Sequence, residues 1–171
     1  MYLTFPGRIF YNFIKALFCV ITRVEIIGAK YFQKQYPFGK IEFRQPVSNK
    51  QLFWIITGPF LICSFFAFAI GTCGIIPFFS LGVYPFEFNV ITVTRYMQIY
   101  IGFCVGVNAF PDIQGLRELI EVCKKNKNIL VKITGTPVFL LMLQIVKWSA
   151  LWLNAAYGVF CITAVPLLLT M

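Results

Sequence analysis

A long run without a single charge most constrains how this chain can fold. Residues 51–71 read QLFWIITGPFLICSFFAFAIG and contain no Asp, Glu, Lys or Arg. An α-helix needs about 20 consecutive apolar residues to cross the hydrocarbon core of a bilayer. We therefore expect a transmembrane helix over residues 51–71.

Four further apolar stretches extend this prediction. Residues 90–110 have Arg95 near enough to their start for its side chain to extend to the membrane surface, and residues 149–170 carry no charge. The run at 134–147 is marginal for crossing a bilayer alone. The stretch at about 7–29 is interrupted by charges, so its helix either packs inside a bundle or lies in the interface.

These stretches predict an all-α integral membrane protein with four to five transmembrane or interfacial helices, forming a single membrane domain over residues 1–171. The composition agrees, because 59% of the residues are hydrophobic and only 12% are charged. Soluble domains average near a quarter charged residues, and disordered chains need low hydrophobicity. The composition therefore excludes both of those classes.

Most of the basic residues fall in two loops, at 30–50 and 111–132, whereas residues 72–89 carry only Glu87. Basic loops remain on the cytosolic or matrix side of a membrane. We therefore expect the two basic loops on that side and residues 72–89 on the other. Gly and Pro interrupt the apolar 72–89 segment, which predicts a re-entrant turn, an interfacial cap or a surface covered by another protein.

The two basic loops differ in their predicted structure. Aromatic and β-branched residues alternate around Pro37-Phe38-Gly39, which predicts a short hairpin-like loop near residues 31–45. Residues 112–127 have the spacing of a basic amphipathic helix that begins after Pro111, with Asp112 in its first turn. Its basic residues either only fix the topology or contact anionic lipid head groups or an acidic partner. They are Arg117, Lys124, Lys125, Lys127 and Lys132.

We find no catalytic or metal-binding constellation in the sequence. The chain has no histidine, which excludes Ser-His catalysis, haem ligation by histidine and most zinc chemistry. Its six cysteines are scattered without a Cys-x-x-Cys pair, and no glycine-rich phosphate loop is present. Basic residues interrupt apolar runs and do not line a nucleic-acid groove. We expect no enzyme activity, no cofactor or metal, and no nucleic-acid partner.

One stretch near the N-terminus resembles a known catalytic motif. Pro6-Gly7 is followed after three residues by Tyr11-Asn12-Phe13-Ile14-Lys15. This order resembles the Pro-Gly-x-x-x-His-Glu-x-x-His-Ala motif that opens the first core helix of small site-2-protease metallopeptidases. Tyr11 and Lys15 stand where the histidines belong, and Asn12 stands where the glutamate belongs.

Shorter motifs extend the resemblance over about residues 4–120. Gly58-Pro59 matches a Gly-Pro of the next span, residues 37–42 match the family's hairpin, and residues 108–111 stand where the family has His-Ala-Phe-Pro. The resemblance implies a protease scaffold without its zinc site. Tyr, Asn and Lys cannot hold a catalytic zinc or activate its water. Asp112 follows where a third ligand could lie, but one carboxylate does not hold a catalytic zinc.

The polar residues of these motifs form a candidate vestigial site or set of polar contacts. Asn12 and Lys15 lie one helical turn apart. One interpretation is that they make a polar contact in the core or bind a partner's carboxylate or a lipid phosphate. The other is that Lys15 extends to the membrane interface and Asn12 makes a local hydrogen bond. Asn108 either bonds across helices or lines a former site. The full set is Tyr11, Asn12, Lys15, Asn108 and Asp112.

Our function hypothesis is a non-catalytic integral membrane subunit with a structural or assembly role in a larger complex. An accessory subunit of an energy-transducing complex in the mitochondrial inner membrane is one example, with other membrane subunits and anionic phospholipids as partners. The alternative is a small transporter or channel component with a polar path near Lys15 and Asn108. The first hypothesis predicts paired, dry polar groups, and the second predicts a hydrated cavity. An active membrane hydrolase would need a constellation that the sequence does not contain.

Overall fold

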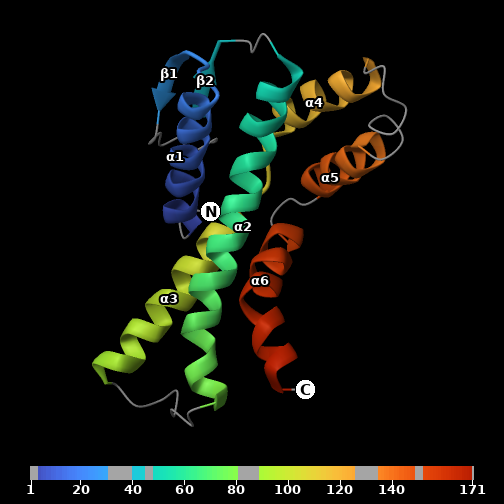
Figure 1. Ribbon diagram of the computed structural model, residues 1–171. Helices are drawn as coiled ribbons and strands as arrows, with labels where there is room; N and C mark the ends of the chain where they lie inside the picture. The colour runs from blue at the N-terminus through green and yellow to red at the C-terminus, as the bar shows by residue number, and fades with distance from the viewer. Residues whose placement is uncertain are drawn as a thin grey trace.

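The computed structural model describes residues 4–30, 40–44, 48–80, 89–125, 135–148 and 152–170. This part of the chain is predominantly helical, as the sequence predicts, and includes one small antiparallel sheet (Figure 1). Its elements are α1 (Phe5–Ile21), β1 (Ile26–Lys30), β2 (Lys40–Phe43), α2 (Asn49–Ser80), α3 (Val90–Val107), α4 (Ile113–Lys125), α5 (Thr136–Trp148) and α6 (Trp152–Thr170).

Helix α2 is the central element, and α1, α3, α4 and α6 pack along it. Its C-terminal half forms a three-helix bundle with α3 and α6 (Figure 1). Glycines allow close approach in this bundle, because a Cβ added at Gly102 would lie 2.8 Å from the Cα of Gly71. A Cβ added at Gly106 would lie 3.0 Å from the Cα of Gly158. We call this unit the helix bundle.

The other elements surround the N-terminal half of α2, and we call this second unit the cap. It consists of α1, β1, β2, α4, α5 and that half of α2 (Figure 1). Helix α1 runs along α2, with Phe10 against Phe66 and Phe18 stacked on Trp54. Helix α4 buries Leu116 against α2 and α5. The amphipathic helix predicted over residues 112–127 is confirmed within its described part.

Helix α2 is longer than the sequence predicts, because it continues through Pro77 to Ser80. The prediction of a turn or cap beginning at residue 72 is therefore wrong for residues 72–80, and residues 81–88 lie outside the described part. Proline has no N–H, so Pro77 leaves the carbonyl of Cys73 without its helical donor. Arg95 of α3 replaces that donor, with its Nη1 atom 3.2 Å from the Cys73 oxygen.

Helix α1 is shorter than the predicted helix over residues 7–29, because it ends at Ile21. Arg23 has a left-handed backbone with a φ of 57°, which an α-helix cannot contain. The β-branched residues that follow favour a strand, and β1 begins at Ile26. Strand β2 lies inside the predicted hairpin of residues 31–45, and the segment between the strands lies outside the described residues.

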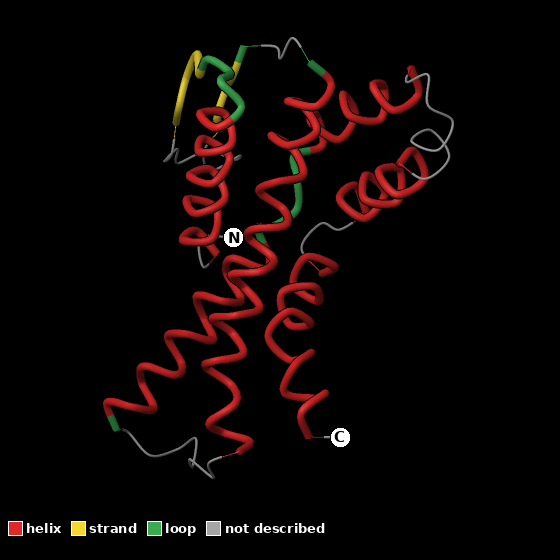
Figure 2. Tube along the Cα trace, in the orientation of Figure 1, coloured by secondary structure: helices red, strands yellow, loops and turns green. Residues whose placement is uncertain are grey.

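Two described helices, at Asn49–Pro77 and Val90–Val107, are long and apolar enough to cross a membrane. A third span is possible if α5 and α6, which bend by 112° relative to each other, count as one broken span. The sheet and α4 lie at one end of the molecule, and the end of α2 and the start of α3 lie at the other (Figure 2). The described residues of the two basic segments therefore lie at the same end.

Candidate functional site: an ion cluster between α1 and the start of α4

Helix α1 turns its polar face inward. Arg8, Asn12 and Lys15 are spaced four and three residues apart, so they lie on one face of the helix. Asn12 is 1% exposed and Lys15 8% exposed. The opposite face exposes Ile9, Phe13 and Leu17. This polarity is the reverse of a helix on the surface of a soluble protein and is typical of apolar surroundings.

The inward face meets the carboxylate of Asp112, which lies between α3 and α4. The Nη2 atom of Arg8 is 2.6 Å from Oδ1 of Asp112, and Nζ of Lys15 is 3.1 Å from Oδ2. Each carboxylate oxygen therefore binds one cation. These three residues, which we call the ion cluster, join the first helix of the chain to the segment that follows α3.

The ion cluster keeps Asp112 ionised. Partial burial raises the pKa of Asp112, but the charges and hydrogen bonds of Arg8 and Lys15 outweigh that effect and lower the pKa to about 2. The side chains are 16% exposed for Arg8, 10% for Lys15 and 32% for Asp112. At neutral pH the cluster therefore contains two positive charges and one negative charge, and the carboxylate is its most accessible member.

Aromatic rings flank both cations. The guanidinium of Arg8 lies 5.1 Å from the centroid of the Tyr11 ring, and Nζ of Lys15 lies 5.6 Å from that of Phe43. The 1% exposed ring of Tyr11 packs in a buried group with Cys63 of α2. Tyr11 thus connects the ion cluster to the apolar interior.

The start of α1 is also fixed to the end of α3. The Nδ2 atom of Asn108 donates to the carbonyls of Thr4 and Cys104, both at 2.9 Å. Gly7 lies against the same region, because a Cβ added there would overlap the carbonyl of Cys104. Asn108 therefore bonds across helices, one of the two roles expected for it.

The structure brings Tyr11, Lys15 and Asp112 together. In the motif of the protease resemblance, Tyr11 and Lys15 stand at the two histidine positions. Asp112 follows where a third ligand could lie. The chemistry differs, because the Lys15 ammonium repels a metal cation and binds the carboxylate itself. Lys15 is 8% exposed and does not extend to a surface. The Nδ2 atom of Asn12 is buried and has no acceptor in the part of the chain that the structure describes.

Sequence analysis places Arg8 near the helix face of Asn12 and Lys15 but does not include it among the candidate site residues. It lies seven residues before Lys15, two helical turns along the same face, and this spacing was the available signal. Asp112 was expected as a first-turn acid of the following helix. Its carboxylate instead binds side chains of α1.

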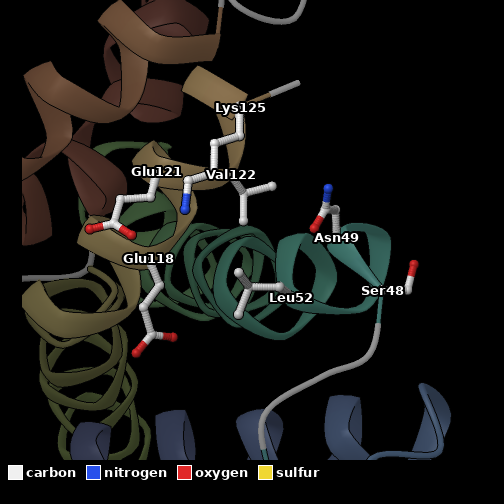
Figure 3. A pocket seen from close by; sticks show the side chains of 7 residues that line it. All are labelled: Ser48, Asn49, Leu52, Glu118, Glu121, Val122 and Lys125. Atoms are coloured by element: carbon white, nitrogen blue, oxygen red, sulfur yellow. The ribbon is translucent and has the colours of Figure 1, made fainter. Parts of the chain in front are cut away.

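The predicted lipid or partner contacts lie away from the ion cluster. Arg117, Lys124 and Lys125 are exposed on α4, and Lys127 and Lys132 lie outside the described residues. Lys125 borders a pocket between α4 and the start of α2 (Figure 3). The pocket is lined by Ser48, Asn49, Leu52, Glu118, Glu121, Val122 and Lys125. Its mixed charge shows that this surface of α4 is not uniformly basic.

Comparison with known proteins adds no family to this description. No protein-family model, curated protein or solved structure matches the chain.

Proposed function

We propose that this chain is a non-catalytic, membrane-embedded subunit with a structural or assembly role in a larger protein complex. The proposal rests on one observation: the polar side chains of the candidate site bind other groups of the same chain. Both oxygens of Asp112 bind cations of α1, and Asn108 bonds two carbonyls. A catalytic or transport site needs such groups to face a substrate or an ion.

The lengths of the helices support a position for the membrane around the helix bundle. The 18 residues of α3 are about 27 Å long at 1.5 Å per residue, which fits a hydrocarbon core of about 30 Å. The 29-residue apolar segment of α2 is about 43 Å long and exceeds that thickness. A Cβ added at Gly106 near the end of α3 would lie 3.4 Å from Cβ of Ala67, so α2 residues before Ala67 extend beyond α3.

The part of α2 that extends beyond α3 belongs to the cap, and the surface of the cap is also apolar. Phe13 of α1 is 55% exposed, Trp54 of α2 is 50% exposed and Leu141 of α5 is 62% exposed. Large apolar surfaces outside the hydrocarbon core mark sites of contact with other proteins. This surface supports the proposal of partner subunits that cover the cap.

The proposed orientation follows the charges. The sheet and α4 carry the basic segments, so we place the cap on the cytosolic or matrix side. An energy-transducing complex of the mitochondrial inner membrane is the first assembly to test. The polar path of a transporter or channel is less well supported, because Lys15 and Asn108 are bonded within the chain. The scaffold would be that of a site-2 protease without its zinc site.

The decisive experiment is extraction of native membranes with mild detergent, followed by native electrophoresis and mass spectrometry. We expect stoichiometric migration with a large membrane complex. Photo-cross-linkers at Phe13 and, as a control, at Phe160 of α6 locate the contacts, since both side chains are exposed. Phe13 should yield adducts with proteins, and Phe160 adducts with lipid. Migration as a free monomer or small homo-oligomer would refute the proposal.

A further inference from the structure

Arg95 is the only charged residue of α3, a helix that we place in the membrane. Helix α6 has no charged residue, and α2 has only Lys50, in its first turn. Arg95 follows Val90 by five residues, which is about 7.5 Å along the helix. In the proposed position it therefore lies inside the hydrocarbon core. A charged side chain there is costly, and such residues mark functional contacts.

The side chain of Arg95 stays at the depth of its own backbone. Its Nη1 atom is 3.2 Å from the carbonyl oxygen of Cys73 on α2. A Cβ added at the next residue, Gly74, would lie 3.1 Å from the carbonyl oxygen of Arg95, so α2 and α3 are at the same level there. The guanidinium therefore extends sideways to α2 and not toward the start of α3, where the nearer membrane surface lies.

The hydrogen bonds of Arg95 leave one edge of its guanidinium without an acceptor. Nη1 also donates to Oε1 of Gln98, at 3.1 Å. A guanidinium carries N–H groups on Nε, Nη1 and Nη2, and those of Nε and Nη2 have no acceptor among the described residues. Parallel N–H groups of this kind bind the two oxygens of a carboxylate. Cys73 is exposed, so the guanidinium lies at the surface of the helix bundle.

The helix bundle itself supplies no counter-charge, because α2, α3 and α6 contain no Asp or Glu. The acidic residues that the structure describes lie around the sheet and α4, at the other end of the molecule from the start of α3 (Figure 2). A second copy of this chain would bring an equally acid-free bundle. Glu87 lies outside the described residues and is tested below. Phospholipid phosphates lie at the membrane boundary, further out than the guanidinium.

We propose that Arg95 anchors a partner subunit by binding an Asp or Glu carboxylate on a transmembrane helix of that partner. Nε and Nη2 donate to the two carboxylate oxygens, while Nη1 keeps its bonds to Cys73 and Gln98. The partner segment is helical, because backbone groups exposed to lipid must bond within their own segment. This inference rests on the proposed subunit role and adds the chemistry of one contact.

The test uses the full-length chain in native membranes, with a photo-cross-linker at Ile91 or at Met97. Both positions are 58% exposed on α3. Ile91 lies one turn before Arg95 on the same face, whereas Met97 faces away from Arg95 and is the matched control. We expect Ile91 to capture a transmembrane segment of another protein with an Asp or Glu near the adduct. Changing that residue to its amide should remove the adduct.

A charge variant shows whether the capture depends on Arg95. Arg95→Gln is made in a Pro77→Ala background, where α2 supplies its own N–H to the Cys73 carbonyl, and Pro77→Ala alone is the reference. We expect Arg95→Gln to lower the yield of the Ile91 adduct about tenfold and to leave the Met97 adducts unchanged. Glu87→Gln should leave the Ile91 adduct at its wild-type yield.

The proposal is overturned if Ile91 captures only lipid, if the captured segment has no acidic residue, or if Arg95→Gln leaves the yield unchanged. Loss of the adduct in Glu87→Gln would assign the counter-charge to this chain and also overturn it. Migration with a large complex together with lipid adducts at Ile91 would keep the subunit role and remove only this contact. Migration as a free monomer with lipid adducts would refute both.

Discussion

The guanidinium of Arg95 donates a hydrogen bond of 3.2 Å to the carbonyl of Cys73. This is the carbonyl that would receive the backbone N–H of residue 77, where proline has none. Arg95 also donates to Gln98 on its own helix at 3.1 Å. A side chain of α3 thus completes the hydrogen bonding of α2 and allows that helix to continue past a proline.

The coupling between these positions can be measured. We expect Arg95→Met to lower the free energy of unfolding by about 1–3 kcal/mol, because the Cys73 carbonyl loses its donor. In a Pro77→Ala background the helix supplies its own N–H, so the same change should cost less. Thermal or denaturant unfolding in detergent gives the double-mutant cycle. Met97→Leu, at an exposed position of α3, is the control. Equal costs in both backgrounds would contradict this account.

Sequence analysis predicts the features of this fold that depend on neighbouring residues in the chain, and it misses those that depend on distant ones. The runs at 51–71 and 90–110 predict helices correctly, because their apolar character is a property of each run alone. The continuation of α2 through residues 72–80 depends on Arg95, which belongs to another helix. A proline in the sequence indicates that a helix loses one hydrogen bond at that point. The local sequence does not indicate the distant donor that replaces it.

The same distinction applies to the candidate site. The spacing of Asn12 and Lys15 predicts a shared helical face, since that depends only on helix geometry. The partner of Lys15, Asp112, lies 97 residues away in the sequence, and no local pattern indicates this pairing. The early end of α1 was missed for a different reason, because the left-handed backbone of Arg23 has no counterpart in hydropathy.

Removal of Asp112 should destabilise the protein more than removal of either cation. Asp112→Asn removes the carboxylate that both Arg8 and Lys15 bind, and breaking a buried pair in this way costs about 3–5 kcal/mol. Arg8→Met or Lys15→Met leaves one balanced pair and should cost less. Unfolding in detergent ranks the three variants, with the exposed Glu121→Gln as the control. A smaller effect for Asp112→Asn than for Lys15→Met would be inconsistent with this geometry.

The same carboxylate predicts a dependence of stability on pH. The pKa of Asp112 is lowered from 3.8 in its ordinary state to about 2 in the folded protein. A lowered carboxyl pKa stabilises the folded state above the unfolded pKa, and this contribution is lost as the pH falls through the folded pKa. The stability difference between wild type and Asp112→Asn should be constant above about pH 5 and shrink toward pH 2. A difference that already shrinks near pH 6 would assign the effect to another group.

The contact between Gly7 and the Cys104 carbonyl predicts a strong effect of a single methyl group. In Gly7→Ala the new Cβ would overlap that carbonyl, so α1 must move away from α3 and strain the bond from Asn108 to Thr4. Overpacking of this kind costs about 1–3 kcal/mol. Gly28→Ala is the matched control, because its Cβ would lie 3.9 Å from the nearest side-chain atom, in Glu42. We expect unfolding in detergent to separate the variants clearly. Equal stability of the two variants would show that α1 does not pack against α3 in this way.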